Sequence, residues 1–159
     1  GNAISINGTF LSGKNGVAGE LGHIPVDGNH SLCGCGNRGC MENIAGGKYL
    51  SHLCQTEYLN TKVGELFHIH GMDSVLRKFV DRMAMAVAAE INILDPDYVL
   101  IGGGVPNMKE FPLEYLEQKI REHVRKPYPE RNLKLIFAED EEDKCVVGAA
   151  VYAAEKMKY

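Results

Sequence analysis

Three features that define large protein classes are missing from this sequence: an excess of basic residues, a long apolar run and an even set of cysteines. Lysine and arginine together number 17 against 21 aspartates and glutamates, which gives a net charge of −4. Because there is no basic stripe, we expect no nucleic-acid binding through this segment. No apolar run reaches the length needed to cross a membrane, so we expect no membrane partner.

The cysteines argue against a secreted, disulfide-bonded protein. There are five, an odd number, in a chain without a visible secretory signal. Disulfide frameworks belong mainly to small secreted domains, whereas 45% of these residues are hydrophobic, enough for an ordinary core. We therefore expect one cytoplasmic domain. The sequence begins Gly1-Asn2-Ala3 without methionine, and we expect it to be a fragment or a processed chain.

One stretch, residues 13–42, holds three of the five cysteines and two of the six histidines. Cys33, Cys35 and Cys40 follow the spacing C-x-C-x4-C, and two histidines, His23 and His30, precede them. Three thiolates and one imidazole make a complete tetrahedral zinc set, which would fix this glycine-rich segment. The cysteines could instead be free thiols, a redox pair or half of a disulfide framework. We favour zinc with His23 as the fourth ligand, although His30 lies closer in sequence.

Two carboxylates, Glu20 and Glu42, flank the zinc motif. Carboxylates accept strong hydrogen bonds and therefore suit ligands that carry hydroxyl groups. Simpler explanations exist: residues 13–22 could be a flexible linker, and Glu42 could only stabilise a helix start through the helix dipole. If zinc fixes the segment, both carboxylates are held in place beside it.

The rest of the chain predicts alternating helices and strands. Asn7-Gly8 predicts a hairpin turn. Helices are expected over residues 41–45, 48–55, 58–72, 74–94, 112–124 and 146–157, and strands over 98–101 and 133–138. Asp73 or Ser74 is expected to cap the longest helix, and the acidic run 139–143 to be a solvated loop without metal. This order predicts an α/β domain with a mixed sheet.

Three glycines, Gly102, Gly103 and Gly104, directly follow the predicted strand 98–101. Bare backbone at a strand end can pack closely against a purine or phosphate group, so these glycines are candidate nucleotide contacts. A tight turn without any ligand explains them equally well.

Two motifs make the sequence similar to a known family. Residues 13–23 follow the pattern G-x-x-G-x-A-G-E-x-G-H, and residues 33–42 follow C-x-C-G-x-x-G-C-x-E. Both resemble the signature of the ROK family of sugar kinases and related repressors, and the resemblance continues through DPDYVLIGGGV into the last helix. Among the members, the D-allose kinases are the most similar, on VAGELGHIP, INILDPD and a Met-x-x-Phe-Pro run.

The resemblance implies a fold and a reaction. The fold would be a ribonuclease-H-like lobe of the actin and hexokinase type, with a mixed sheet, an edge hairpin and a zinc-binding loop. Residues 1–159 would be the C-terminal lobe of a two-lobed kinase, and the N-terminal lobe would lie outside this chain. The reaction would transfer the γ-phosphoryl group of ATP, carried with Mg²⁺, to a hexose hydroxyl. Family members commonly pair through this lobe, so a homodimer or higher homo-oligomer is expected.

The resemblance also implies roles for individual residues. Glu20, His23 and Glu42 would contact the sugar, and His23 would bind zinc through one ring nitrogen while its other N–H faces a sugar hydroxyl. Four protein ligands make the zinc structural rather than catalytic. Those ligands would be His23, Cys33, Cys35 and Cys40. The family's general base is an aspartate in the N-terminal half, which has no counterpart here, so the isolated chain would be inactive.

Two other functions fit some of the same motifs. Repressors of the family share the zinc and sugar motifs and add an upstream helix-turn-helix, so this chain could be the effector-binding lobe of a sugar-responsive repressor. The features shared with D-allose kinases favour the enzyme. A zinc-stapled interaction module without a sugar would not explain why Glu20 and Glu42 bracket the zinc motif.

Overall fold

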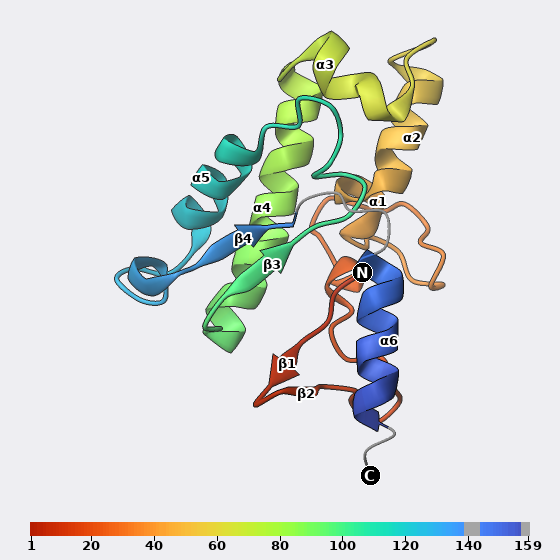
Figure 1. Ribbon diagram of the computed structural model, residues 1–159. Helices are drawn as coiled ribbons and strands as arrows, with labels where there is room; N and C mark the ends of the chain where they lie inside the picture. Colours follow the sequence, from red (N-terminus) through yellow and green to blue (C-terminus); the bar gives the residue numbers. More distant parts are fainter. Residues whose placement is uncertain (139–143, 157–159) are drawn as a thin grey trace.

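The computed structural model describes residues 1–138 and 144–156 (Figure 1). The acidic run 139–143, predicted to be a solvated loop, lies outside the described residues, as does Met157 at the predicted end of the last helix. The elements in chain order are β1 (Ser5–Ile6), β2 (Thr9–Phe10), η1 (Leu21–His23), α1 (Glu42–Ala45), α2 (Gly47–Thr56), η2 (Val63–Glu65), α3 (Leu66–His70), α4 (Ser74–Leu94), β3 (Val99–Ile101), α5 (Leu113–His123), η3 (Glu130–Asn132), β4 (Leu135–Phe137) and α6 (Lys144–Lys156).

The longest helix, α4, forms the centre of the core, and α5 packs along it (Figure 1). Asp73 caps α4 as predicted, because its side chain accepts hydrogen bonds from the N–H groups of Val75 and Leu76. The residues of α4 that are buried are Leu76, Phe79, Val80, Ala84, Ala86, Ala88 and Ile91. The helix expected over residues 74–94 is thus confirmed and buries one apolar face, while its last residue, Leu94, is 38% exposed.

The amino-terminal hairpin forms where the sequence predicts it. β1 and β2 pair antiparallel, with Ser5 opposite Phe10 and Ile6 opposite Thr9. Asn7 and Gly8 both have positive φ angles, 51° and 76°, as a two-residue hairpin turn requires.

The prediction of a single mixed sheet is wrong for the described part of the chain. β3 and β4 form a separate parallel pair, with Val99 opposite Leu135 and Ile101 opposite Phe137. The hairpin pairs within itself, because each of its strands is only two residues long and exposed, which leaves little edge to join β3. The α/β class itself is confirmed.

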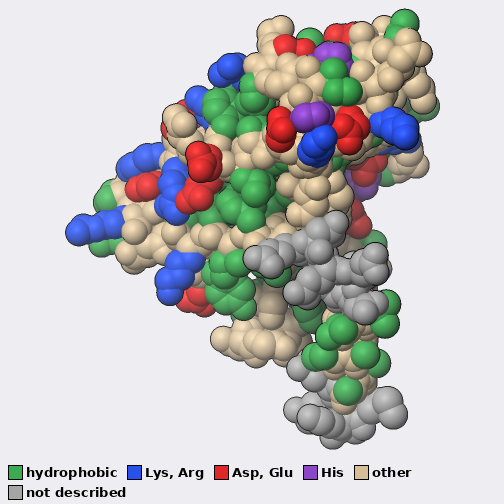
Figure 2. All heavy atoms as spheres, turned by 45° about the horizontal axis from the view of Figure 1, so that its top comes forward, with side chains coloured by type: hydrophobic (Ala, Val, Ile, Leu, Met, Phe, Trp, Pro, Cys, Tyr) green, Lys and Arg blue, Asp and Glu red, His purple; other side chains and the backbone are tan. Residues whose placement is uncertain are grey.

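Two apolar surfaces remain exposed. The inner face of the β3–β4 sheet packs on the core through Val99, Ile101, Leu135 and Phe137, whereas Leu100 and Ile136 on the outer face are 63% and 46% exposed. Parallel sheets are normally covered on both faces. Helix α6 is also exposed along its described length, and apolar side chains dominate its surface (Figure 2). Its Tyr152 makes an edge-on ring contact with Phe10 of β2, at 5.6 Å between centroids.

Two helix boundaries differ from the prediction. Pro112 lies just before α5 rather than inside it, with a ψ angle of 70° that is not helical. The single helix expected over residues 58–72 is divided, because Asn60 has a left-handed φ of 69° and only η2 and α3 are helical there. Among the described residues, no helix combines the length and apolar character needed to cross a bilayer.

Candidate metal centre and its carboxylates

The loop that carries the three cysteines, residues 33–40 (the cysteine loop), folds back toward η1 through backbone hydrogen bonds. The N–H of Val26 donates to the carbonyl of Gly39 at 2.8 Å, and the N–H of Met41 donates to the carbonyl of Ile24 at 3.0 Å. Through these two bonds, the segment around Cys40 lies antiparallel to the segment that follows His23. The motif's distant histidine is thereby placed beside its cysteines.

A tight turn brings the first two cysteines into position. The N–H of Cys33 donates to the carbonyl of Asn37 at 2.8 Å, and the N–H of Gly36 donates to the carbonyl of Cys33 at 3.0 Å. Gly39 then lets the chain pass close to Asn29, because a Cβ at position 39 would lie 2.6 Å from the Asn29 carbonyl oxygen. The φ of Gly39 is also +85°, which side chains rarely adopt.

Four potential metal-binding groups converge in this loop. The donor atoms of His23, Cys33, Cys35 and Cys40 all lie within 4.8 Å of one another. The sulfur atoms of Cys35 and Cys40 are 3.6 Å apart, and the sulfur of Cys33 is 3.6 Å from Nδ1 of His23. A tetrahedral zinc with bonds of about 2.3 Å to sulfur and about 2.0 Å to nitrogen requires donors roughly 3.5–3.8 Å apart. The donor set therefore fits zinc, and it includes His23 rather than His30.

The pKa values of two of the thiols are shifted in opposite directions. A hydrogen bond from the backbone of Asn37 lowers the pKa of the exposed Cys35 thiol. Burial, followed by the neighbouring sulfurs of Cys33 and Cys35, raises the pKa of the Cys40 thiol to about 12. Three adjacent thiolates would repel one another strongly, so a bound dication is the natural way to hold all three deprotonated.

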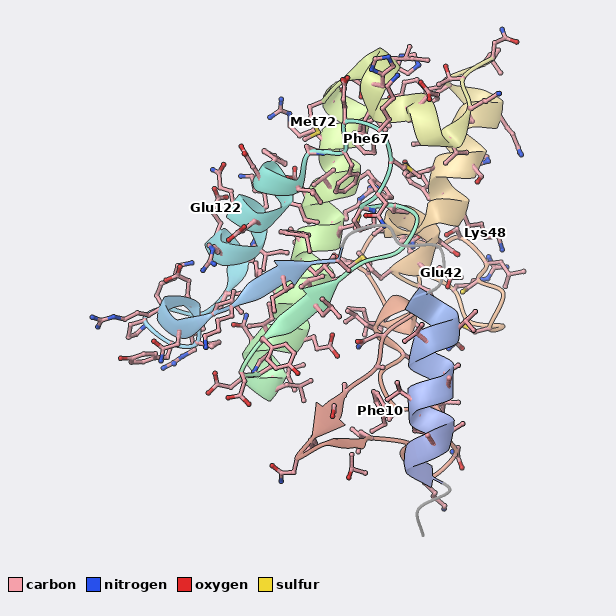
Figure 3. All side chains as sticks on the ribbon, viewed as in Figure 1. Phe10, Glu42, Lys48, Phe67, Met72 and Glu122 are labelled. Carbon is pink, nitrogen blue, oxygen red and sulfur yellow. The ribbon has the colours of Figure 1, made fainter. Side chains whose placement is uncertain are left out.

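Both predicted carboxylates lie against the donor set. Oε2 of Glu20 is 3.6 Å from Nε2 of His23, and Oε1 of Glu42 is 4.0 Å from the sulfur of Cys33. Glu42 is the first residue of α1, close to the cysteine loop (Figure 3). The Glu20 side chain is 57% exposed and the His23 side chain 30% exposed, so a ligand could reach them. The structure thus places Glu20, His23 and Glu42 around one donor set, and their role as sugar contacts stays a prediction.

The glycine turn after β3 is explained in part by packing. A Cβ on Gly102 would lie 3.0 Å from Cβ of Ala138, and Gly103 has a φ of +104°. Gly104 has no such constraint, since a Cβ there would meet nothing within 4 Å. Two of the three glycines therefore have structural reasons of their own, and a nucleotide role for this turn stays a prediction.

Sequence analysis did not predict a hollow of about 650 Å³ at the amino ends of β3 and β4. It is lined by Asp95, Pro96, Asp97, Pro129, Arg131, Asn132, Leu133 and Lys134. These residues come from two segments more than thirty positions apart, whose proximity depends on how α4 packs against the chain after α5. The charged residues carry no recognisable spacing, so the sequence offered no signal for this hollow.

Comparison with known proteins places the whole chain in one family. The profile of the ROK family matches residues 1–156. The glucokinase of Thermotoga maritima is 25% identical over 177 residues, which cover 99% of this chain and 56% of the relative. The N-acetyl-D-glucosamine kinase of Yersinia enterocolitica is 30% identical over 140 residues, which cover 78% of this chain and 46% of the relative. The chain thus spans about half the length of the curated relatives it matches.

Solved structures with a similar fold include a hexokinase and a transcriptional regulator. The ROK hexokinase of Thermus thermophilus matches with a TM-score of 0.77 at 25% identity, over 98% of this chain and 54% of that one. A ROK family transcriptional regulator, a homologue of the E. coli MLC protein, matches with a TM-score of 0.68 at 26% identity, over 88% of this chain and 39% of that one.

Proposed function

The chain belongs to the ROK family, and on that premise we propose that it is the sugar-binding and zinc-binding lobe of an ATP-dependent hexose kinase. The observation that carries the proposal is the position of Glu20 and Glu42, each of which lies against a different member of the metal donor set. A metal ion bound by the donor set would hold both carboxylates, two strong hydrogen-bond acceptors, at fixed positions. The kinase relatives support phosphoryl transfer as the reaction.

The proposed sugar site uses three side chains of this chain. Glu20 and Glu42 accept hydrogen bonds from ring hydroxyls, and each charge-assisted bond of this kind contributes about 1.5–3 kcal/mol. His23 faces the sulfur cluster with Nδ1 and presents Nε2 on its other side, where an N–H can serve a hydroxyl or a carboxylate. A zinc held by His23 and the three cysteines would supply rigidity and neutralise the thiolates, without an open position for water.

The nucleotide is proposed to bind away from the cysteine motif, at the turn of Gly102, Gly103 and Gly104 that follows β3. This turn leaves the carboxyl end of β3, the end of a parallel sheet at which α/β proteins bind ligands. ATP would arrive with Mg²⁺, which neutralises the charge that develops on the transferred phosphoryl group. We assign no catalytic residue within this chain, because the family resemblance places the general base, an aspartate, in the N-terminal half.

We further propose that residues 1–159 are the C-terminal lobe of a longer, cytoplasmic and oligomeric protein with a ribonuclease-H-like fold. The coverage of about half of each relative supports this. The apolar outer face of the β3–β4 sheet, with Leu100 and Ile136 exposed, is the kind of surface that another part of a protein covers. D-allose is proposed as the sugar on the resemblance of VAGELGHIP and INILDPD to allose kinases, with glucose and N-acetylglucosamine as the alternatives that the relatives name.

The second candidate function is the effector-binding lobe of a sugar-responsive repressor. The matched transcriptional regulator supports it, since a regulator of the same family shares this fold. Both functions need the same sugar site, so the site itself does not separate them. The two functions are distinguished by whether the longer protein consumes ATP or binds DNA.

A panel assay tests the proposal. The longer protein that contains this chain is incubated with ATP, Mg²⁺ and allose, glucose or N-acetylglucosamine, and ADP release is measured. We expect turnover with at least one hexose, and none with the isolated 159-residue chain under the same conditions. Sugar-dependent DNA binding without turnover would replace the kinase by the repressor, and robust turnover by the isolated chain would show that its catalytic base lies within residues 1–159.

A further inference from the structure

We propose that Glu20 is a positioning residue of the metal centre: its carboxylate accepts the Nε2–H of His23 and so holds the ring with Nδ1 directed at the cysteine sulfurs. This rests on the proposed zinc site and adds a second task to the sugar contact proposed for Glu20. It concerns the orientation of the imidazole ligand before a sugar binds, since a bound sugar hydroxyl would compete for the same Nε2–H.

The backbone of η1 places the two side chains together. The N–H of His23 donates to the carbonyl of Glu20 at 3.0 Å, which closes one turn of 3₁₀ helix. Because a 3₁₀ helix has three residues per turn, the side chains at positions i and i+3 stand one above the other. Glu20 itself is the residue just before η1, and its carboxylate lies 3.6 Å from Nε2 of His23.

The two nitrogens of the ring face different groups. Nδ1 lies 3.6 Å from the sulfur of Cys33, on the side of the donor set, and Nε2 lies 3.6 Å from Oε2 of Glu20. A neutral imidazole carries one N–H, and the nitrogen that binds a metal must be the one without it. A ring that binds zinc through Nδ1 therefore has its proton on Nε2, directed at the Glu20 carboxylate.

A gap remains between Oε2 of Glu20 and Nε2 of His23. At 3.6 Å the two atoms are farther apart than the roughly 2.7–2.9 Å of a charge-assisted N–H···O bond, so the proposal requires the exposed Glu20 side chain to rotate toward the ring. A carboxylate on the far nitrogen of a metal-bound histidine fixes the tautomer and makes the ring a stronger donor. Loss of such a partner typically weakens metal binding about 10- to 100-fold.

Glu42 provides a matched control on the same loop system. Its carboxylate lies 4.0 Å from the sulfur of Cys33, whereas that of Glu20 lies 3.6 Å from Nε2 of His23. Removing Glu42 therefore takes away the same charge at a similar distance from the donor set, but leaves the ring nitrogen and its partner intact. Any effect specific to ring orientation should appear at Glu20 and be absent at Glu42.

The test measures zinc affinity on the 159-residue chain, by competition with a chromophoric chelator in reducing buffer. We expect Glu20→Ala to bind zinc about 10- to 100-fold more weakly than the unaltered chain. Glu20→Gln keeps an acceptor oxygen and should recover most of that affinity, and Glu42→Ala should change it far less than Glu20→Ala. In ¹⁵N spectra, Glu20→Ala should also lose the preference of the metal-free His23 ring for a proton on Nε2.

Two results would overturn the proposal. Unchanged zinc affinity in Glu20→Ala would show that the carboxylate does not position the ring. Equal losses in Glu20→Ala and Glu42→Ala would show that only nearby negative charge matters. The measurement uses neither sugar nor ATP, so it fails independently of the proposed kinase activity, while an absence of zinc binding by the unaltered chain would reject the metal site itself.

Discussion

The hydroxyl of Tyr58 donates a 2.6 Å hydrogen bond to Asp73, the residue that caps α4. The Tyr58 ring also lies 4.5 Å from the ring of His70, whose Nε2 is 2.9 Å from Oγ1 of Thr61. One small polar cluster therefore connects the segment between α2 and α3 to the start of the main core helix. His68 of the same helix, α3, is at the surface, where its Nδ1 lies 2.8 Å from Oε1 of Glu110.

Tyr58→Phe should destabilise the chain by about 0.5–1.5 kcal/mol, because it removes one partly buried hydrogen bond. Asp73→Ala removes the cap as well and should cost about 0.5–2 kcal/mol. Urea unfolding followed by circular dichroism measures both. The double variant should lose less than the sum of the two, since the Tyr58–Asp73 bond is counted in each single variant, and full additivity would show that the bond contributes nothing.

The same cluster makes stability depend on pH. Burial and then the hydrogen bond to Asp73 raise the pKa of Tyr58 well above its usual value, so its contribution is present below about pH 10 and is lost as pH rises through the folded pKa. Burial would raise the pKa of Asp73, but hydrogen bonds from Leu76, Tyr58 and Val75 outweigh it and lower that pKa. Asp73 therefore stabilises the fold above its ordinary pKa and loses this contribution in acid. Tyr58→Phe should flatten the alkaline decline in unfolding free energy.

Removal of zinc should loosen residues 13–42 before it unfolds the helices. That segment has few buried side chains apart from Cys33, Cys40 and Met41, whereas α4 and α5 share a continuous apolar core. Elemental analysis of the reduced protein should find one zinc per chain, and hydrogen exchange after chelation should accelerate in this segment first. Metal content near zero in intact, reduced protein would contradict the site.

Glu42→Gln in the longer protein separates sugar binding from helix stabilisation. If the carboxylate grips a sugar hydroxyl, kcat/KM for the sugar should fall roughly 10- to 100-fold, the equivalent of about 1.5–3 kcal/mol, while KM for ATP barely changes. If Glu42 only stabilises the start of α1, stability should fall by about 0.3–1 kcal/mol without a kinetic effect. His23→Ala should differ in kind, since it should lose zinc and sugar affinity together.

Gly39→Ala should weaken the zinc loop more than Gly28→Ala does. Both glycines have positive φ, +85° and +72°, so each substitution carries a backbone cost of about 1–2 kcal/mol. A Cβ at position 28 meets nothing within 4 Å, whereas at position 39 it meets the Asn29 carbonyl oxygen at 2.6 Å. Thermal unfolding and zinc titration of the two variants measure the difference. Equal effects would mean that the loop relaxes around the added methyl group.

Local features of the chain could be predicted because neighbouring residues determine them. Asn7-Gly8 specifies its turn by conformational preference, Asp73 and the apolar spacing specify α4, and C-x-C-x4-C brings three thiols together within eight residues. The choice of His23 over His30 was not determined by spacing. That choice depends on the antiparallel pairing of the segment around Cys40 with the segment around Ile24, which only the folded chain shows.

Contacts between distant segments could not be predicted from the sequence. Whether the hairpin joins β3 depends on packing far from residues 5–10, and the sequence pattern of a strand does not name its neighbour. The hollow beside Asp95 and Lys134 likewise depends on two segments meeting across the end of α4. The contact between Glu20 and His23 is an intermediate case. The sequence shows that the two residues are three positions apart, but the surrounding glycines gave no indication that a helical turn forms there.

The 3.6 Å separation of the Cys35 and Cys40 sulfurs also governs how the loop responds to oxidants. Cys35 is exposed and the Asn37 backbone lowers its pKa, so its thiol ionises more readily than an ordinary cysteine and lies beside a second thiol. A two-electron oxidant that reaches Cys35 first would convert the pair into a disulfide and remove two of the four metal ligands at once. A zinc ion that held both sulfurs would protect them from this chemistry. The order in which metal and oxidant arrive therefore decides whether the loop remains able to bind metal or must first be reduced.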